Sequence, residues 1–183
     1  GYGTHESMRD LMADFLTDAA TAGNTKRSCW LCSDDTDTNI ECGSTNSNVA
    51  TAQLNIWSSG THRSNTTATV GQRHTLTGSI SSSNDGYFKS TLFYAPQINF
   101  HNLRLATNST SIVHAFVVAA SGTGSNISPR VDAYDCELAI GSSANANGAV
   151  LSTDPAASSG SGGGVRLARC SGATGLVYRF SQG

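Results

Sequence analysis

Three of the five cysteines lie close together early in the chain, as Cys29 and Cys32 followed by Cys42. A Cys-x-x-Cys pair is typical of zinc sites and redox centres, because two thiolates at this spacing can bind one metal ion or each other. A tetrahedral zinc site needs a fourth ligand, and neither a second Cys-x-x-Cys pair nor a His-x-x-x-His pair follows. We therefore expect no metal site and no cofactor. The sequence leaves open whether these cysteines are reduced and buried or disulfide-linked.

The acidic residues and histidines offer little support for catalysis. Asp34 and Asp35 are adjacent and could supply the two acids of a polysaccharide-cleaving site. His74, His101 and His114 stand singly, with no serine or acid at a spacing that suggests a catalytic triad. We expect no catalytic residues, and interpret the histidines as surface residues or members of side-chain ladders.

The elements that position these groups are indicated by a repeat. Residues 98–105, 131–138 and 165–172 align without a gap, and their starting positions are almost evenly spaced. Each segment is apolar at its first, third and sixth positions and polar at its fifth, which predicts a strand, a sharp bend and a second strand. Stacked copies would place Cys136 beside Cys170, where a disulfide is geometrically possible. We favour an inward apolar ladder, because a free cysteine packs like a small hydrophobic residue.

The polar positions of the repeat support stacking. Residues in register on adjacent strands lie close together, so like charges there would repel. The copies instead predict three pairs of opposite charge, namely Asp132 with Arg166, Asp135 with Arg169, and Arg104 with Glu137.

A shorter period appears when the register is extended backwards. Leu54, Leu76 and Ile98 follow one another at two equal steps. One coil of a three-sided parallel β-helix needs about 20 residues, and each step is just above this minimum. The later, longer steps would then contain side loops at about residues 119–130 and 141–164. We predict an all-β fold, a single-stranded parallel β-helix of about five to six coils.

The N-terminal residues predict the one convincing helix. Residues 4–20 place their apolar side chains on one stripe, with Thr4 or Ser7 available as N-cap. Such a helix can cover the open apolar end of a β-helix. We therefore divide the chain into a capping helix at residues 1–23 and a β-helix at residues 24–183, which together form one structural domain.

The bend positions carry a family resemblance. Asn102 and Asp135, with alternating apolar residues around them, resemble the right-handed parallel β-helix family that includes pectate lyases and phage tailspikes. The resemblance covers roughly residues 54–183 and implies a right-handed coil in which an Asn at this bend forms a ladder with its neighbours. Here the third member is Arg169, so the predicted structural ladder is the set Asn102, Asp135, Arg169, Cys136 and Cys170.

The family would also suggest cleavage of polysaccharides by carboxylates. Asp34 and Asp35 resemble the paired acids of pectinases, but the Gly-His-Gly and Arg-Ile-Lys segments of those enzymes are missing. The acids of the repeat are better explained as partners of arginines on neighbouring coils. We expect a non-enzymatic protein, with a polysaccharide lyase or hydrolase as the second alternative.

Composition excludes several classes of partner. The chain of 183 residues has a formal net charge of −2 and 13% charged residues, which gives no basic face for nucleic acid. No apolar run is long enough to span a bilayer, so we expect no membrane partner. The predicted last strand, at residues 176–180, ends without a cap, and we expect another subunit to cover it.

These features favour a virion structural protein made in the host cytoplasm. A small β-helix that assembles as a homotrimer resembles bacteriophage cement proteins that decorate a capsid, with the major capsid protein or another virion protein as partner. The first alternative is a tailspike or fibre that binds glycans on a cell surface. Candidate glycan or interface contacts for that reading are the aromatic residues Trp57, Tyr87, Tyr94 and Tyr178.

Overall fold

The computed structural model describes residues 4–58, 73–79, 81, 85–108, 117–119, 130–140 and 165–172. These residues form one α-helix, one short 3-10 helix and thirteen strands. In chain order they are α1 (Met8–Ala22), β1 (Lys26–Leu31), β2 (Asp35–Asp37), β3 (Ile40–Glu41), η1 (Ser47–Thr51), β4 (Gln53–Ser58), β5 (Thr75–Gly78), β6 (Phe88–Ser90), β7 (Gln97–His101), β8 (Arg104–Thr107), β9 (Val117–Ala119), β10 (Val131–Tyr134), β11 (Glu137–Ile140), β12 (Val165–Ala168) and β13 (Ser171–Gly172).

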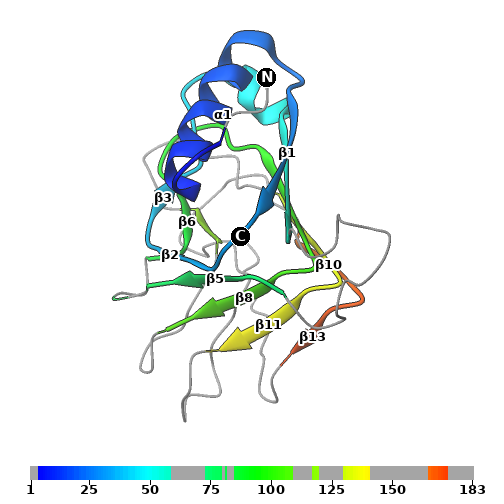
Figure 1. Cartoon of the computed structure of the whole chain (residues 1–183). Helices are drawn as coiled ribbons and strands as arrows, with labels where there is room; N and C mark the ends of the chain where they lie inside the picture. The colour runs from blue at the N-terminus through cyan, green and yellow to red at the C-terminus, as the bar shows by residue number, and fades with distance from the viewer. Residues whose placement is uncertain are drawn as a thin grey trace.

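The strands form three separate sheets whose paired strands all run parallel. Sheet A has the order β1-β4-β7-β10-β12, sheet B the order β13-β11-β8-β5-β2, and sheet C the order β3-β6-β9. The chain passes through A, B and C in turn and then returns to A beside its previous strand (Figure 1). We call each such passage a circuit. Sheet A contains five strands, so the described residues include five circuits, the last two with strands in sheets A and B.

The register confirms the alignment of the three repeat segments. Val131 pairs with Ile98 on one side and with Val165 on the other, and Leu138 pairs with Leu105 and Gly172. The repeat therefore consists of successive strands of sheet A and the strands of sheet B that follow them.

The short period predicted from Leu54, Leu76 and Ile98 is wrong. Leu54 pairs with Ile98 in sheet A, whereas Leu76 lies in sheet B and pairs with Leu105. The second circuit therefore runs from Leu54 to Ile98, twice the predicted step, and the first runs from Arg27 to Leu54. The error has a physical cause, because inward-facing apolar residues alternate in the same way along the strands of every sheet. The pattern identifies strands without identifying the sheet to which each belongs.

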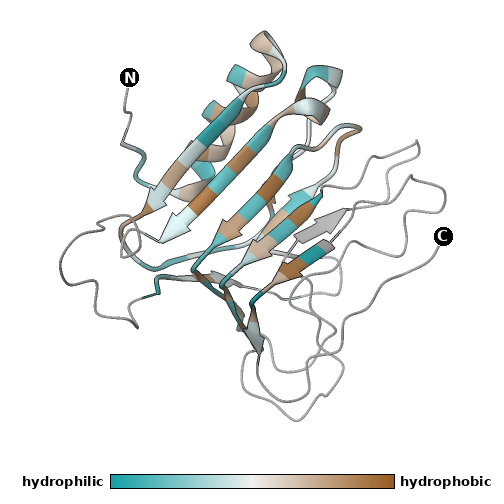
Figure 2. Ribbon diagram, turned by 90° about the vertical axis from the view of Figure 1, so that its right-hand side faces the viewer, coloured by the Kyte–Doolittle hydropathy of each residue, from teal (hydrophilic) through white to brown (hydrophobic). Residues whose placement is uncertain are grey.

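The core is a narrow apolar column enclosed by the three sheets. Hydrophilic and hydrophobic residues alternate along the strands of sheet A in Figure 2, as expected for strands with one buried face. The fully buried large side chains are Tyr87, Phe88, Phe100, Met12, Ile40, Leu54, Ile56, Leu76, Ile98, Leu103 and Leu105. Leu103 and Cys136 are buried at the bend between sheets A and B, and Cys170 is half-buried at the same bend one circuit further on.

The predicted N-terminal helix is present as α1. Its N-cap is Ser7, whose hydroxyl accepts a hydrogen bond from the backbone N–H of Asp10 at 3.1 Å. Met12 and Phe15 are among the α1 residues buried in the core, and the helix packs against η1 and β3. It ends at Gly23, which has φ 58° and ψ 163°, a conformation that is almost restricted to glycine. In the described part of the chain, α1 is too short and too polar to span a membrane.

Candidate functional site

Cys29, Cys32 and Cys42 differ in burial. All five cysteines are free thiols, with Cys42 fully buried, Cys29 half-buried and Cys32 exposed. Burial raises the pKa of the Cys29 thiol to about 12 and raises that of Cys42 further still. Within the described ranges, no group of three or more His, Cys, Asp or Glu residues is placed to hold a metal ion. Cys29 and Cys42 therefore carry little thiolate, which is the form that reacts and binds metal ions, whereas Cys32 is exposed at the surface.

The three acids after Cys32 bind three different parts of the fold. Asp34 Oδ1 accepts a hydrogen bond from the backbone N–H of Thr75 at 2.7 Å. Asp35 accepts one from the hydroxyl of the buried Tyr87. These acids therefore tie β2 to neighbouring strands.

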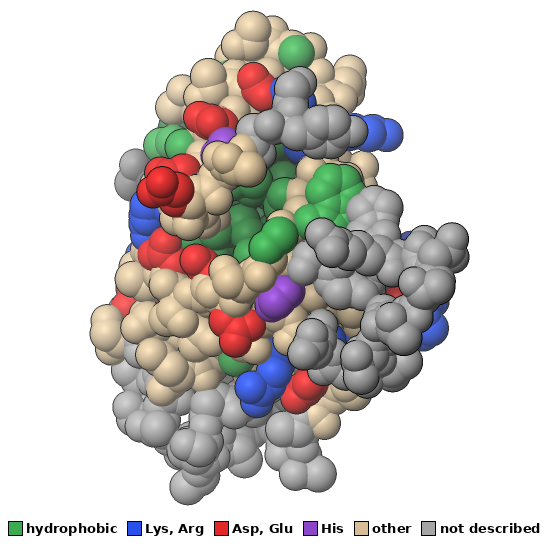
Figure 3. All heavy atoms as spheres, viewed as in Figure 1, with side chains coloured by type: hydrophobic (Ala, Val, Ile, Leu, Met, Phe, Trp, Pro, Cys, Tyr) green, Lys and Arg blue, Asp and Glu red, His purple; other side chains and the backbone are tan. Residues whose placement is uncertain are grey.

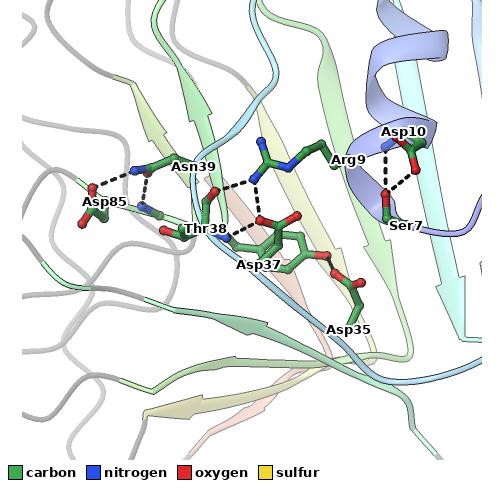
Figure 4. A network of polar contacts seen from close by, with 10 residues as sticks. Ser7, Arg9, Asp10, Asp35, Asp37, Thr38, Asn39 and Asp85 are labelled. Atoms are coloured by element: carbon green, nitrogen blue, oxygen red, sulfur yellow. Dashed lines mark hydrogen bonds and ion pairs between the residues drawn. The ribbon is translucent and has the colours of Figure 1, made fainter.

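The third acid joins β2 to the helix (Figure 4). Asp37 Oδ1 lies 2.5 Å from Arg9 Nη2, which also donates to the carbonyl oxygen of Thr38 at 2.8 Å. Asn39, which has a left-handed backbone, donates to Asp85 Oδ1 at 2.8 Å and accepts from the backbone N–H of Gly86. These bonds hold α1, β2 and the start of β3 in place.

The predicted ladder forms a row at the bend between sheets A and B. Asn102, Asp135 and Arg169 have left-handed φ values of 51°, 54° and 53°. The backbone N–H of Asn102 donates to Tyr134, and that of Asp135 donates to Ala168, each at 3.0 Å. The same bend therefore recurs in three successive circuits.

The side chains of this row associate as two pairs. Arg73, which precedes β5, donates from Nε to Asn102 Oδ1 at 3.0 Å. Arg169 donates to Asp135 at 2.6 and 2.7 Å. The hydrogen bonds from Arg169 hold the pKa of the Asp135 carboxyl below its usual range. The row therefore contains one arginine–amide pair and one arginine–carboxylate pair, in place of a continuous ladder of amide side chains.

The two cysteines of the ladder point toward the carbonyl groups of sheet A. Cys136 Sγ lies 3.3 Å from the carbonyl oxygen of Tyr134, and Cys170 Sγ lies 3.4 Å from that of Ala133. Both thiols are free, and burial raises the pKa of Cys136 to about 12. Together with Leu103 they occupy successive inward positions at the bend.

One of the predicted charge pairs has a different partner. Arg104 Nε lies 3.2 Å from Glu137 Oε1, and Arg169 binds Asp135, as predicted. Asp132 is in register with Arg166, but its carboxylate binds Arg130 at 3.3 Å. The prediction of an Asp132–Arg166 ion pair is therefore wrong.

A column of flat side chains runs across the outer face of sheet A. The rings of Trp57 and His101 stack with centroids 3.7 Å apart and an interplanar angle of 7°. His101 stacks in turn on Tyr134 at 5.1 Å and 9°, and the guanidinium carbon of Arg166 lies 5.8 Å from the Tyr134 ring centroid. We call these four residues the aromatic column. The sequence analysis named Trp57 and His101 separately, named Arg166 only as a partner of Asp132 and did not name Tyr134, although His101 and Tyr134 share the fourth position of the repeat.

A row of polar side chains lies beside the aromatic column. Asn99 donates to Asn55 Oδ1 at 2.9 Å and accepts from Gln97 at the same distance. Asp132, only 1% exposed, accepts from Gln97 at 3.2 Å, from the Tyr134 hydroxyl at 3.1 Å and from both Nε and Nη2 of Arg130. This polar row and the aromatic column place aromatic, amide and carboxylate groups side by side on the outer face of sheet A.

The other predicted aromatic contacts are placed differently. Tyr87 is fully buried and Tyr94 is half-buried beside Ser44, with which its backbone forms an antiparallel bridge. Burial therefore removes Tyr87 from any surface contact. Tyr178 lies outside the described residues, as do the predicted last strand, most of the first predicted side loop and the whole of the second.

Comparison with known proteins adds no relative: no family model, no curated protein and no solved structure matches this chain.

Proposed function

We propose that the chain is a single right-handed parallel β-helix and serves as a non-enzymatic structural protein of a bacteriophage virion, a cement protein that decorates the capsid. The passage of the chain through sheets A, B and C with parallel pairing supports one continuous coil. In this proposal α1 caps the first coil, because its buried side chains join the same core. The protein is made in the host cytoplasm and then assembles onto the virion.

One observation carries the non-enzymatic part of the proposal. Each described acid of the strands and bends is bonded to another part of the scaffold. A glycosidase needs one carboxyl as proton donor and a second as base or nucleophile, placed on either side of the scissile bond. Carboxylates that are committed to arginines, tyrosine hydroxyls and backbone N–H groups stabilise the coil instead. The acids are Asp34, Asp35, Asp37, Glu41, Asp85, Asp132, Asp135 and Glu137.

The proposed assembly is a homotrimer that contacts the major capsid protein or another virion protein through the ends and side loops of the β-helix. The test uses the whole chain of 18.9 kDa in analytical ultracentrifugation, followed by co-sedimentation with expanded capsids of the phage that encodes it. We expect a trimer that sediments with the capsids. A monomer that stays in the supernatant would contradict the proposal.

The outer face of sheet A favours a second candidate function, glycan recognition by a tailspike or fibre. Aromatic rings beside amide and carboxylate groups are the side-chain types that contact sugars, through the apolar face of the sugar ring and through its hydroxyls. A glycan array probed with the wild-type chain and with Trp57→Ala tests this function, with Thr36→Ala on sheet B as control. Hits that Trp57→Ala loses and Thr36→Ala keeps would favour the glycan function over the cement function.

The second alternative, a polysaccharide lyase or hydrolase, can be tested on the same glycans. Release of reducing ends by the wild-type chain, and its loss in Asp34→Asn or Asp35→Asn, would establish it. The commitment of both acids to the scaffold leads us to expect no release.

A further inference from the structure

The inward-facing side chains of β1, the first strand of sheet A, are more exposed to solvent than those of β4, the next strand. Arg27, Cys29 and Leu31 of β1 are in register with residues of β4 that are buried. On β1 the same inward positions are exposed at Arg27 and half-buried at Cys29 and Leu31. The apolar interior therefore opens to solvent beside β1.

The helix α1 covers a different part of this end. It packs against η1 and β3, and its side chains Leu11 and Leu16 stay half-buried at the edge of the core. Figure 3 shows the result as a hollow in the middle of the face, with a hydrophobic floor and with acidic side chains above it, to its left and below it. We call this feature the N-terminal hollow. Its apolar residues include Cys29 and Leu31, the half-buried inward side chains of β1.

The part of the chain that forms the N-terminal hollow is acidic overall. Residues 4–58 contain eight acidic and three basic side chains, whereas the remaining described residues contain four acidic and six basic ones. Two of the three bases, Arg9 and Arg27, are already paired with Asp37 and Asp18. The side chains of Asp14 and Asp34 are 75% and 71% exposed, so their charge faces solvent.

We propose that the N-terminal hollow binds a basic amphipathic segment of a partner protein. An apolar floor of leucine and cysteine side chains favours apolar side chains, and the acidic surroundings favour Lys or Arg beside them. The same negative charge repels nucleic acid and anionic lipid surfaces. This binding site is independent of the proposed capsid function, because it follows from the first circuit alone.

The test measures binding of a labelled model peptide by fluorescence anisotropy. The probe is an amphipathic peptide of about 15 residues built from Leu and Lys, long enough to form a helix. The comparison peptide has Glu in place of every Lys. At a physiological ionic strength of about 0.15 M, we expect the Leu–Lys peptide to bind the whole chain at least about tenfold more tightly than the Leu–Glu peptide. Absence of binding, or equal binding of the two peptides, would overturn the proposal.

Variants then locate the bound peptide. Leu31→Gln removes part of the apolar floor, and we expect it to weaken binding about tenfold. Ser28→Gln is the matched control, because Ser28 is an exposed, outward-facing residue of the same strand, and it should bind like wild type. Equal affinities of Leu31→Gln and wild type, or an equal loss in Ser28→Gln, would place the peptide elsewhere and refute the site.

A second variant avoids the core altogether. Asp14→Asn with Asp34→Asn changes two exposed side chains, and the amide oxygen at position 34 can still accept from Thr75. We expect this double variant to weaken the Leu–Lys peptide and to leave the Leu–Glu peptide no weaker than before. Sedimentation of the chain without peptide shows whether the chain binds a second copy of itself. An oligomer that Leu31→Gln dissociates would assign the hollow to a second copy of the chain and overturn the proposal.

Discussion

Arg169 donates two hydrogen bonds to the carboxylate of Asp135, from Nε to Oδ1 at 2.6 Å and from Nη2 to Oδ2 at 2.7 Å. Both residues have a left-handed backbone, which is uncommon for arginine. The fork-shaped guanidinium matches the carboxylate in a way that a lysine ammonium cannot. The bend imposes a left-handed backbone on the residue at this position. The ion pair therefore offsets the free-energy cost of that conformation for Arg169.

Substitution of Arg169 should separate these two effects. Arg169→Lys keeps the backbone strain and loses the paired hydrogen bonds, so we expect a lower midpoint of thermal unfolding than in wild type. Arg169→Asn loses the charge but suits the left-handed conformation, so its midpoint should lie above that of Arg169→Lys. Circular dichroism melts would measure both.

The control for this comparison is Arg104→Lys. Arg104 forms a similar exposed ion pair with Glu137, but it lies in the regular strand β8. Arg104→Asn should therefore gain nothing relative to Arg104→Lys. A midpoint for Arg169→Asn below that of Arg169→Lys would show that the ion pair outweighs the backbone strain.

The register of the later circuits could be read from the sequence because each copy carries the same strand-bend-strand pattern. Val131 between Ile98 and Val165 was predicted by apolar positions alone, and the pairing confirms it. The left-handed bend at Asn102 and Asp135 was also accessible, since Asn and Asp tolerate that conformation. The pattern of apolar and polar residues was sufficient to predict strand register wherever successive circuits have the same spacing between strand, bend and strand.

The early circuits and the outer face of sheet A were less predictable. Leu76 fits the apolar pattern of sheet A but belongs to sheet B, because 16 residues separate β4 from β5 in the sequence, whereas only two separate β7 from β8. The partner of Asp132 was missed because Arg130 is two residues away on the same face, and strand register alone cannot rank it against Arg166. The N-terminal hollow depends on how α1 lies on the first circuit, which is a tertiary property.

The thiols should differ sharply in reactivity. A thiolate is the reacting species, and burial raises the pKa values of Cys29 and Cys136 to about 12 and that of Cys42 higher still. We expect N-ethylmaleimide to modify the exposed Cys32 at least about a hundredfold faster than these three in the native protein. Labelling for timed intervals, followed by peptide mass spectrometry, measures each site.

Two controls accompany the labelling. Cys32→Ser should remove the fast phase and leave the slow sites unchanged. Unfolding in guanidinium chloride should bring all sites to similar rates, because the burial is lost. Rapid modification of Cys42 or Cys136 in the native protein would contradict their placement in the core.

The aromatic column should show a measurable coupling between Trp57 and His101. Parallel stacking at 3.7 Å predicts an interaction of about 0.5–1.5 kcal/mol beyond the burial of each ring. A double-mutant cycle of Trp57→Ala and His101→Ala, followed by urea unfolding, isolates this term from the cost of each truncation. The matched cycle pairs Trp57→Ala with Arg104→Ala, a residue of sheet B outside the column. Its coupling should be close to zero, and equal couplings in the two cycles would refute a specific stack.

His101 should make the stability of the fold depend on pH. Its Nε2 atom is buried and has no hydrogen-bond partner, and burial lowers the pKa of its imidazole, although the nearby Asp135 carboxylate acts in the opposite direction. The unfolded chain therefore binds a proton near pH 6.5, at the ordinary pKa of histidine, while the folded chain does not. Stability contributed by the neutral ring is present above that pH and declines as the pH falls toward the lowered pKa.

The variant His101→Phe keeps a flat ring between Trp57 and Tyr134 but cannot be protonated. We expect its free energy of unfolding, relative to wild type, to rise as the pH is lowered from about 7 to about 5. The histidine ring signals in NMR measure the titration directly and separate His101 from the other four histidines. A charged imidazolium between two aromatic faces would gain cation–π attraction, which opposes burial. A titration midpoint above about 6.5 would mean that this attraction and Asp135 together outweigh the burial of Nε2, and the sign of the pH dependence would reverse.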